Sequence, residues 1–382
     1  MAASLDALSS PTVSGTVFLL ISLFLVTVLR RKSSGLLPLL QVRQRLPPGP
    51  PGLPLLGNLF DLPQGSPWIG YRELSRRYGA SSRLVPGHEI IVADARASGN
   101  LVHLQILGRS ILLINDVGVA SDLLEKRSTN NSSRPVSTAV EMVGWEWSFV
   151  FMPYGKWWRW HRRAFWQHFH PGAVPKYRGI LEQGAHRLLG RLLAAPDQLE
   201  KHIRYALGTS ICKAAHGLDI AEQDDERMEI FQRALKSVDV LVEGSTVLER
   251  KQYATIQSLF PALALHPEVQ RSARAELDRV VGPNRLPTFA DQDDLPYVSA
   301  IIKELLRWHS VAPLGVAHCS VADDEYNGHF IPADTTILVN MWAIAHDPTR
   351  YPEPGRFRPE RYLKEGELNP DAPDPTEFCF GR

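Results

Sequence analysis

The chain has 382 residues, of which 44% are hydrophobic, and a formal net charge of +1. This length suffices for a large core in one or two domains, and the near-neutral charge gives no support for nucleic-acid binding. The three cysteines, at positions 212, 319 and 379, lie far apart. This spacing argues against a disulfide framework and against a zinc knuckle, and it favours a reducing compartment.

The first predicted element is an uncharged apolar run from Val13 to Leu29, which the basic residues Arg30-Arg31-Lys32 follow. As a helix this run would span about 26 Å, near the short end for a membrane crossing. A cleaved signal peptide would carry its positive charge before the apolar run. Since the charge here follows the run, residues 1–32 are predicted to form a retained membrane anchor, with the remainder of the chain in the cytosol.

Residues 33–58 are predicted to link the anchor to the body. They end in the proline-dense stretch LPPGPPGLPLLGN. Such a stretch cannot form a helix and tends to a stiff, extended conformation. It can serve as a simple linker or as a rigid strut that sets the angle between anchor and body, and the sequence leaves both interpretations open.

Residues 59–382 are predicted to form a mainly α body with a small β region. An aromatic and basic helix is expected at 154–169, and a second helix begins at Pro267 and stops at Gly282. The next expected helix, 295–309, has four apolar residues on one face, namely Val298, Ile301, Ile302 and Leu305. The stretch DTTILVNMWAIAHD begins like a strand and continues like a helix.

A buried charge network is predicted around Glu304. Glu304 and Arg307 are one turn apart on the same face of the expected helix, an arrangement that alone indicates no more than an exposed salt bridge. The proline-rich coil that follows carries the sequence PERY, which contains Arg361. An arginine delivered from a coil onto a helical Glu–Arg pair makes a charge-assisted triad. We therefore expect Glu304, Arg307 and Arg361 to meet and to fix the coil.

Several motifs follow one another in an order that resembles one family. They are PPGPPGLPLLGN after the apolar run, MPYGKWWRWHRR, PYVSAIIKELLRWHSVAPLGVAH, AIAHDPTRYPEPGRFRPERYL and the terminal FCFGR. Together they resemble the microsomal cytochromes P-450, which are haem-thiolate monooxygenases, and most of all the fungal multi-substrate branch. The resemblance implies the cytochrome P-450 fold, haem b as cofactor and NADPH–cytochrome P-450 reductase as partner. It also implies a hydrophobic small-molecule substrate and a single-pass location in the endoplasmic reticulum membrane.

The resemblance assigns three residues to the haem. Trp158 and Arg162 match the W-x-x-x-R helix of the family, which implies hydrogen bonds to a haem propionate. A carboxylate in a largely apolar pocket needs a fixed cation and an indole N–H, so the residue types suit that role. His318, in PLGVAH, matches a further propionate contact. A basic surface helix with buried aromatic residues is the alternative for 154–169.

Two surfaces are implied in the same way. Arg159, His161 and Arg163 resemble the basic patch on which the reductase docks, and an ordinary solvated face is the alternative. The segment before MPYGK resembles the loop over the substrate. It contributes four residues that would line the substrate pocket, or would merely pack on the body: Met142, Trp145, Trp147 and Phe149.

The sequence departs from the family at the metal loop. In the family this loop reads F-x-x-G-x-R-x-C-x-G. Phe378 and Gly381 match the first Phe and Gly, so the ligand cysteine would be the third residue after Arg382. Cys379 falls on a spacer position and is not expected to bind the iron. No metal ligand and no catalytic residue are therefore assigned within these 382 residues, and the metal loop of the fold is expected to be incomplete.

Two further departures concern the body. The oxygen-activating helix falls on VLERKQ, where Arg250 and Lys251 take the places of the acid and the threonine, and Pro261 is expected to interrupt that helix. The stretch before it is shorter than the family uses, so internal helices are expected to be missing. Residues 80–99 look inserted.

Two functions follow from these observations. The family function is haem-dependent monooxygenation of a hydrophobic small molecule with O2 and NADPH, in fungal secondary or xenobiotic metabolism. The alternative is a catalytically inactive, membrane-anchored fragment, which the missing ligand favours for the 382 residues as they stand. The sequence does not indicate the substrate.

Overall fold

The structure, a computed structural model, describes residues 45–79, 101–220, 226–230, 233–234, 248–310 and 312–379, without the side chains of residues 248–253. The chain divides into two units, Met1–Arg45 and Leu46–Arg382, and all described residues except Arg45 belong to the second. The predicted anchor, the apparent insertion at 80–99 and the end of FCFGR lie outside the described residues. Within the described ranges, no helix combines the length and the apolar character that crossing a membrane requires.

A four-stranded sheet forms the β region. Strands β1 (Leu101–Ile106) and β2 (Arg109–Ile114) pair in antiparallel fashion, β6 (Thr336–Val339) runs parallel to β2, and β3 (His318–Cys319) pairs antiparallel with β6. Leu112 and Ile114 point into one buried cluster, whereas Leu113 points into another. Because side chains alternate along a strand, these central strands bury apolar residues on both faces.

Two small hairpins complete the strands. In the first, β4 (Asp324–Tyr326) pairs with β5 (His329–Ile331), and in the second β7 (Leu363–Lys364) pairs with β8 (Glu367–Leu368). Each hairpin is closed by a two-residue turn with glycine in second place, at Gly328 and Gly366. The left-handed backbone of such turns explains the glycines.

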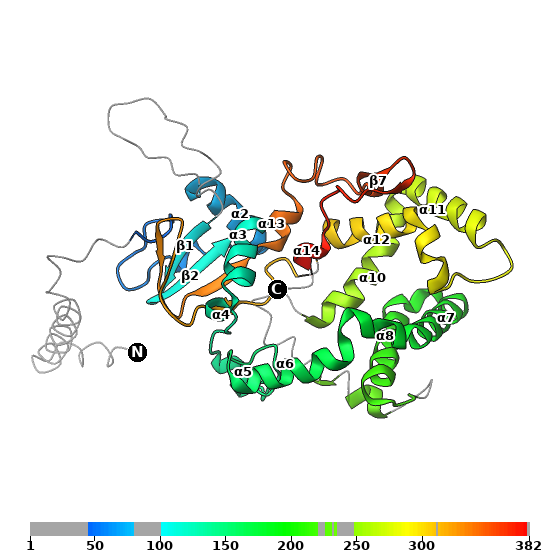
Figure 1. The fold of residues 1–382 in the computed structure, drawn as a ribbon, viewed down its shortest axis with the longest axis horizontal. Helices are drawn as coiled ribbons and strands as arrows, with labels where there is room; N and C mark the ends of the chain where they lie inside the picture. The colour runs from blue at the N-terminus through cyan, green and yellow to red at the C-terminus, as the bar shows by residue number, and fades with distance from the viewer. Residues whose placement is uncertain are drawn as a thin grey trace, which may run out of the picture. The chain divides into compact units, whose positions relative to one another are not determined.

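Helices make up most of the remainder. The α-helices are α2 (Pro67–Tyr78), α3 (Val117–Ser121), α4 (Ser128–Asn131), α5 (Thr138–Met142), α6 (Lys156–Phe169), α7 (Arg178–Ala194), α8 (Leu199–His216), α10 (Leu248–Leu265), α11 (Pro267–Val280), α12 (Pro296–Trp308), α13 (Met341–Ala345) and α14 (Thr376–Cys379). Shorter turns of 3-10 or π-helix are η2 (Leu59–Asp61), η3 (Asp122–Lys126), η4 (Pro171–Tyr177), η5 (Pro196–Gln198), η6 (Phe289–Asp294) and η7 (Pro359–Tyr362). In Figure 1, α2 and α13 accompany the sheet, while α7, α8, α10, α11 and α12 gather apart from it. The prediction of a mainly α body with a small β region is confirmed.

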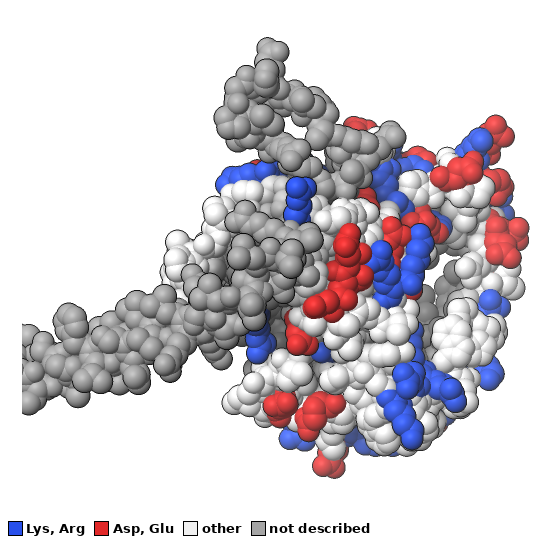
Figure 2. All heavy atoms as spheres, turned by 60° about the vertical axis from the view of Figure 1, so that its left-hand side comes forward, with Lys and Arg blue, Asp and Glu red and all other residues white. Residues whose placement is uncertain are grey.

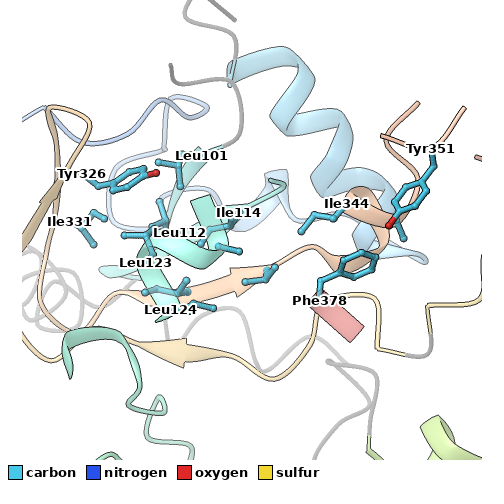
Figure 3. Close-up of a cluster of buried hydrophobic side chains, with 14 of the residues drawn as sticks. Leu101, Leu112, Ile114, Leu123, Leu124, Tyr326, Ile331, Ile344, Tyr351 and Phe378 are labelled. Atoms are coloured by element: carbon cyan, nitrogen blue, oxygen red, sulfur yellow. The ribbon is translucent and has the colours of Figure 1, made fainter. Parts of the chain in front are cut away.

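The core of the sheet extends to the last described helix. Figure 3 shows Phe378 beside Tyr351 and Ile344, in the same buried cluster as Leu112 and Ile114. Phe378 is 2% exposed. Full burial of such a side chain contributes on the order of 1.5–3 kcal/mol, so Phe378 holds α14 against the body.

Helix α12 differs in one respect from the expected apolar face. Ile301 and Leu305 are buried as predicted, but Ile302 is 54% exposed. The inward face is instead shared with two charged residues, Glu304 and Arg307, which are fully buried. Successive residues of a helix are rotated by about 100° around its axis. A helix face that includes Glu304 and Arg307 therefore leaves Ile302 facing solvent.

Helix α10 corrects a second expectation. Pro261 was expected to interrupt the helix, yet α10 continues from Leu248 to Leu265. Proline removes one backbone hydrogen bond and crowds the preceding turn. Here Pro261 is exposed, while its neighbour Ala262 is completely buried in a cluster with Val269 and Phe357. Packing of Ala262 against Val269 and Phe357 therefore keeps α10 helical on both sides of Pro261.

The proline-rich stretch that ends at Asn58 packs on the sheet rather than extending away from it. The amide of His103 donates to Pro48 O at 2.8 Å, and the amide of Asn58 donates to Gln105 O at 2.6 Å. A Cβ on Gly49 would lie 1.9 Å from His103 O, so only glycine permits this approach. Residues 48–58 thus pack against strand β1 as part of the body, and their role toward the anchor stays a prediction.

The described surface carries both signs of charge. On the face shown in Figure 2, acidic and basic side chains lie near one another, with uncharged surface between them. This distribution agrees with the net charge of +1 and does not resemble the continuous basic stripe of a nucleic-acid-binding protein.

Candidate functional site

Arg134 lies near a second cation, Arg162, in the part of the chain that the structure describes. Its Nη1 donates to Val316 O at 3.0 Å and to Ala317 O at 2.8 Å, while its Nε is shielded from solvent without any hydrogen-bond partner. Burial, and then repulsion by the charge of Arg162, lower the pKa of Arg134 to about 10. Among the described residues, no carboxylate forms an ion pair with either arginine.

His318, in strand β3, lies near Arg134. Its ring is buried, and Nδ1 donates to Asn131 O at 3.0 Å. Burial, followed by the nearby charge of Arg134, lowers the pKa of His318 to about 3. The imidazole is therefore neutral at physiological pH, with Nε2 as an acceptor. It would donate a hydrogen bond from Nε2 only if an anion offset the charge of Arg134.

Helix α6 supplies the two predicted haem residues. Trp158 is partly buried, with its ring 5.1 Å from that of Tyr154, and Arg162 is exposed one turn later. None of the residues of α6 is buried. Of the predicted set, Arg162 lies near enough to Arg134 for its charge to lower the pKa of Arg134, and the charge of Arg134 in turn lowers the pKa of His318. Trp158 lies one turn before Arg162 on the same helix.

Arg134 was not predicted from the sequence. Its role depends on contacts with residues more than 180 positions further along the chain. The only local signal is an arginine in SSRPVST with no acidic residue nearby, which by itself does not distinguish a surface arginine from a binding residue.

This arrangement is suited to bind an anion. The partly buried guanidinium of Arg134, repelled by the charge of the exposed Arg162, is unfavourable in the protein without an anion. A carboxylate bound to Arg134 would offset this repulsion and would give the unpaired Nε of Arg134 an acceptor. Haem presents two propionate carboxylates, so the residues present fit that side of the cofactor.

The predicted pocket residues lie beside α6. Trp145 and Trp147 stack with ring centroids 5.3 Å apart, and Phe149 lies 5.4 Å from Phe165 of α6. Met142 and Trp147 are 82% and 64% exposed. The segment therefore packs on the aromatic helix, and two of its four residues face solvent.

The charge network predicted at Glu304 is buried. Arg307 donates from Nε and Nη2 to the two carboxylate oxygens of Glu304, each at 2.8 Å, and both side chains are fully buried. Arg361 Nε lies 3.0 Å from Glu304 Oε2, as an ion pair rather than a directed hydrogen bond. Arg307 also donates to Ala345 O and Pro354 O, and the amide of Arg358 donates to Glu304. The network thus holds the coil onto α12.

Cys379 lies in α14 as a half-buried thiol. Its Sγ donates to Leu306 O at 3.5 Å, and burial, together with the charge of Asp374, raises its pKa to about 12. A neutral thiol that faces the core is a poor metal ligand, because thiolate is the binding form. Ion pairs between Lys303 and Asp374 and between Arg350 and Glu377 fix the segment around it.

The family model described as cytochrome P-450 matches residues 47–248 and 253–381. The break between the two blocks falls on VLERKQ, the stretch in which Arg250 and Lys251 replace the expected residues.

Several fungal proteins are similar over most of their length. Cytochrome P-450 monooxygenase COX2 of Coprinopsis cinerea is 33% identical over 428 aligned residues, which cover 89% of this chain and 78% of that protein. Cytochrome P-450 monooxygenase ppsD of Aspergillus oryzae is 31% identical, covering 88% and 77%. Tryptamine 4-monooxygenase of Psilocybe cyanescens is 30% identical, covering 89% and 81%. These alignments are longer than the 382-residue chain, so the relatives contain residues without a counterpart in it.

Proposed function

Because the chain belongs to the cytochrome P-450 family, we propose that it serves the haem-dependent monooxygenation of a hydrophobic small molecule in fungal secondary metabolism. The observation that carries this proposal is the environment of Arg134: the charge of Arg162 repels it, its Nε has no hydrogen-bond partner, and no carboxylate among the described residues pairs with it, so that it fits a carboxylate ligand. Haem iron is the cofactor of this family, and when bound it supplies the activation of O2.

The chain's own residues would bind and orient the cofactor. Arg134 and Arg162 would pair with its propionates, Trp158 would donate its indole N–H, and His318 would become a donor once the carboxylates offset the charge of Arg134. The neutral Cys379 thiol and the Glu304 network would hold the segment that leads into the metal loop. By the spacing of the family motif, the iron ligand would be the third residue after Arg382.

Electrons would come from an NADPH–cytochrome P-450 reductase. Helix α6 contains basic residues and no acidic ones, and Arg159 and Arg163 are exposed on it. Arg159 lies over the ring of Tyr154, 5.5 Å from its centroid. A basic, exposed helix beside the propionate-binding residues would attract an acidic partner surface.

We further propose that residues 13–29 anchor the protein in the endoplasmic reticulum membrane, with the body in the cytosol. Deleting residues 1–32 is expected to move the protein from the membrane fraction to the soluble or aggregated fraction, because the uncharged apolar run would be lost. Fractionation with alkaline carbonate extraction measures this. Release of the intact protein by carbonate would contradict an integral anchor.

Difference spectroscopy of the reduced protein with carbon monoxide tests the proposed function. The protein expressed from the complete transcript should show the red-shifted Soret band of thiolate-ligated haem and, with reductase and NADPH, oxygenated product. A polypeptide limited to residues 1–382 should show no such band, because the Cys379 thiol is neutral and is hydrogen-bonded within the body.

The variant Cys379→Ser supplies the control for this measurement. It should leave the spectrum of the 382-residue polypeptide unchanged. A red-shifted band that this substitution abolished would make Cys379 the ligand. The protein from the complete transcript can be compared in the same way. If it showed neither the red-shifted band nor turnover, the alternative of a membrane-anchored protein without activity would be favoured.

A further inference from the structure

A hollow lies between helices α7 and α8. Figure 1 shows the two helices side by side, and a Cβ on Gly184 of α7 would lie 2.4 Å from Ser210 Oγ of α8, so the helices touch at this glycine. Beside this contact they leave a space of about 290 Å³ that opens to solvent. Its size suits a small ion rather than a drug-sized ligand. Its polar lining consists of Gln183, Arg187, Thr209, Ser210, Lys213 and Asp219.

The lining contains two cations and one carboxylate. Lys213 Nζ lies 2.5 Å from the carboxylate of Asp219, so these two charges form an ion pair. The hydrogen bond from Lys213, followed by the charges of Lys213, Arg187 and Arg227, lowers the pKa of Asp219. Asp219 is therefore ionised at physiological pH, and it balances the charge of Lys213 alone.

Arg187 supplies the charge that the lining does not balance. It is exposed on α7, and within the described ranges it forms neither an ion pair nor a hydrogen bond. A guanidinium group has five N–H donors in a planar fork, which matches the spacing of oxygens on an oxyanion. All five donors of Arg187 are thus available to a ligand in the hollow.

Two buried hydroxyl groups also line the hollow. Thr209 Oγ1 and Ser210 Oγ donate to the same acceptor, Ala206 O, at 3.1 Å and 2.8 Å. In the continuous helix α8 this carbonyl also accepts the amide of Ser210. Three donors therefore share the two lone pairs of one oxygen. For that reason one hydroxyl can turn toward a ligand at little cost.

We propose that this hollow binds the phosphate group of a small solute, held by Arg187, Lys213 and the hydroxyls of Thr209 and Ser210. Phosphate oxygens accept hydrogen bonds from guanidinium, ammonium and hydroxyl groups, and a bidentate pair with arginine is the strongest of these contacts. The negative charge of the phosphate would balance Arg187. None of these residues belongs to the site near Arg134, so the inference is independent of the haem.

Thermal unfolding of the full chain with inorganic phosphate tests this site. The midpoint should rise with phosphate and reach a plateau, and sodium chloride at equal ionic strength should not reproduce the rise. Arg187→Gln should increase the phosphate concentration at half effect about 10-fold, through loss of charge-assisted hydrogen bonds. The matched control is Arg274→Gln, at an exposed arginine of α11, which should leave that concentration unchanged. An equal rise with chloride would overturn the proposal.

Replacing Asp219 distinguishes an anion site from an ion pair that serves only the fold. Asp219→Asn removes the negative charge that repels the ligand, so the phosphate concentration at half effect should fall about 10-fold. Lys213→Gln should raise it. If the pair served only the fold, both substitutions would lower the midpoint and phosphate would have no effect on either variant or on the unsubstituted chain, which would overturn the proposal.

Arg134→Leu separates this hollow from the site near Arg134, which also attracts anions. The effect of phosphate should persist in Arg134→Leu and be weakened in Arg187→Gln. The reverse result would place the phosphate at Arg134 and would overturn the proposal.

Acidic residues of the chain itself are the rival occupant of the hollow. Glu222, Asp224 and Asp225 follow Ile220 in the sequence and lie outside the described residues. The combined variant Glu222→Gln, Asp224→Asn and Asp225→Asn should respond to phosphate as the unsubstituted chain does. A response confined to the combined variant would show that these carboxylates take the place of the ligand, and would overturn the proposal.

Discussion

Replacing Arg307 by methionine is expected to destabilise the body by about 3–5 kcal/mol, since it leaves a buried carboxylate without its main partner. Arg307 is 0% exposed and donates to both oxygens of Glu304. It also donates to three backbone carbonyls, of Ala345, Pro354 and Arg356, which lie outside helix α12. Loss of this side chain therefore removes both the charge partner of Glu304 and the hydrogen bonds that hold the coil onto α12.

Urea denaturation followed by circular dichroism measures this change. The matched control is Arg76→Met, because Arg76 and Glu73 have the same spacing along a helix but are exposed and 4.0 Å apart. That substitution should have a several-fold smaller effect, as exposed ion pairs contribute little. Should Arg307→Met fail to fold, Arg361→Met removes the other cation near Glu304 and should give an intermediate loss. If Arg307→Met and Arg76→Met lowered the free energy of unfolding by the same small amount, the network would have no stabilising role.

Replacing Arg134 by leucine is expected to have opposite effects on cofactor affinity and on the stability of the unliganded protein. Arg134 lies close enough to Arg162 for repulsion to lower its pKa, and its Nε has no partner. Without Arg134 this repulsion disappears, so the unliganded protein should unfold at a higher temperature. Its affinity for a porphyrin dicarboxylate should fall roughly 10- to 100-fold, the equivalent of one charge-assisted hydrogen bond.

Metal-free protoporphyrin is the appropriate probe, because it carries the two propionates and needs no iron ligand. Quenching of intrinsic tryptophan fluorescence gives its affinity, and thermal unfolding gives the stability. The matched control is Arg159→Leu on α6, which removes an exposed arginine that lies over Tyr154 and should change neither quantity strongly. A loss of stability in Arg134→Leu, with porphyrin affinity unchanged, would assign Arg134 a purely structural role.

The tertiary structure changed some expectations that rested on local rules. Pro261 satisfied the rule for a helix break, but burial of Ala262 and its neighbours keeps α10 continuous. Ile302 fitted the apolar face of α12, yet it faces solvent because Glu304 and Arg307 take the inward positions. In both cases a local preference worth about 3 kcal/mol or less was outweighed by packing with residues distant in the chain.

The sequence by itself determined the family and most of the helical body. Proline and glycine mark the ends of α11, and the order of the motifs around Glu304 predicted which arginines would lie near it. These signals are readable because they depend on residues within a few turns of one another, or on motifs that recur in a fixed order.

Only the tertiary structure decided that Arg134 lies near Arg162 with no ion-paired carboxylate among the described residues, and that exposed leucines adopt a left-handed backbone. Arg134 acquires its environment from the residues just before β3, which lie more than 180 positions later. The amide of Leu107 donates to Leu56 O, so the β1–β2 turn lies against the proline-rich turn. Burial and backbone strain arise from such long-range contacts, and they are absent from the local composition on which a sequence prediction rests.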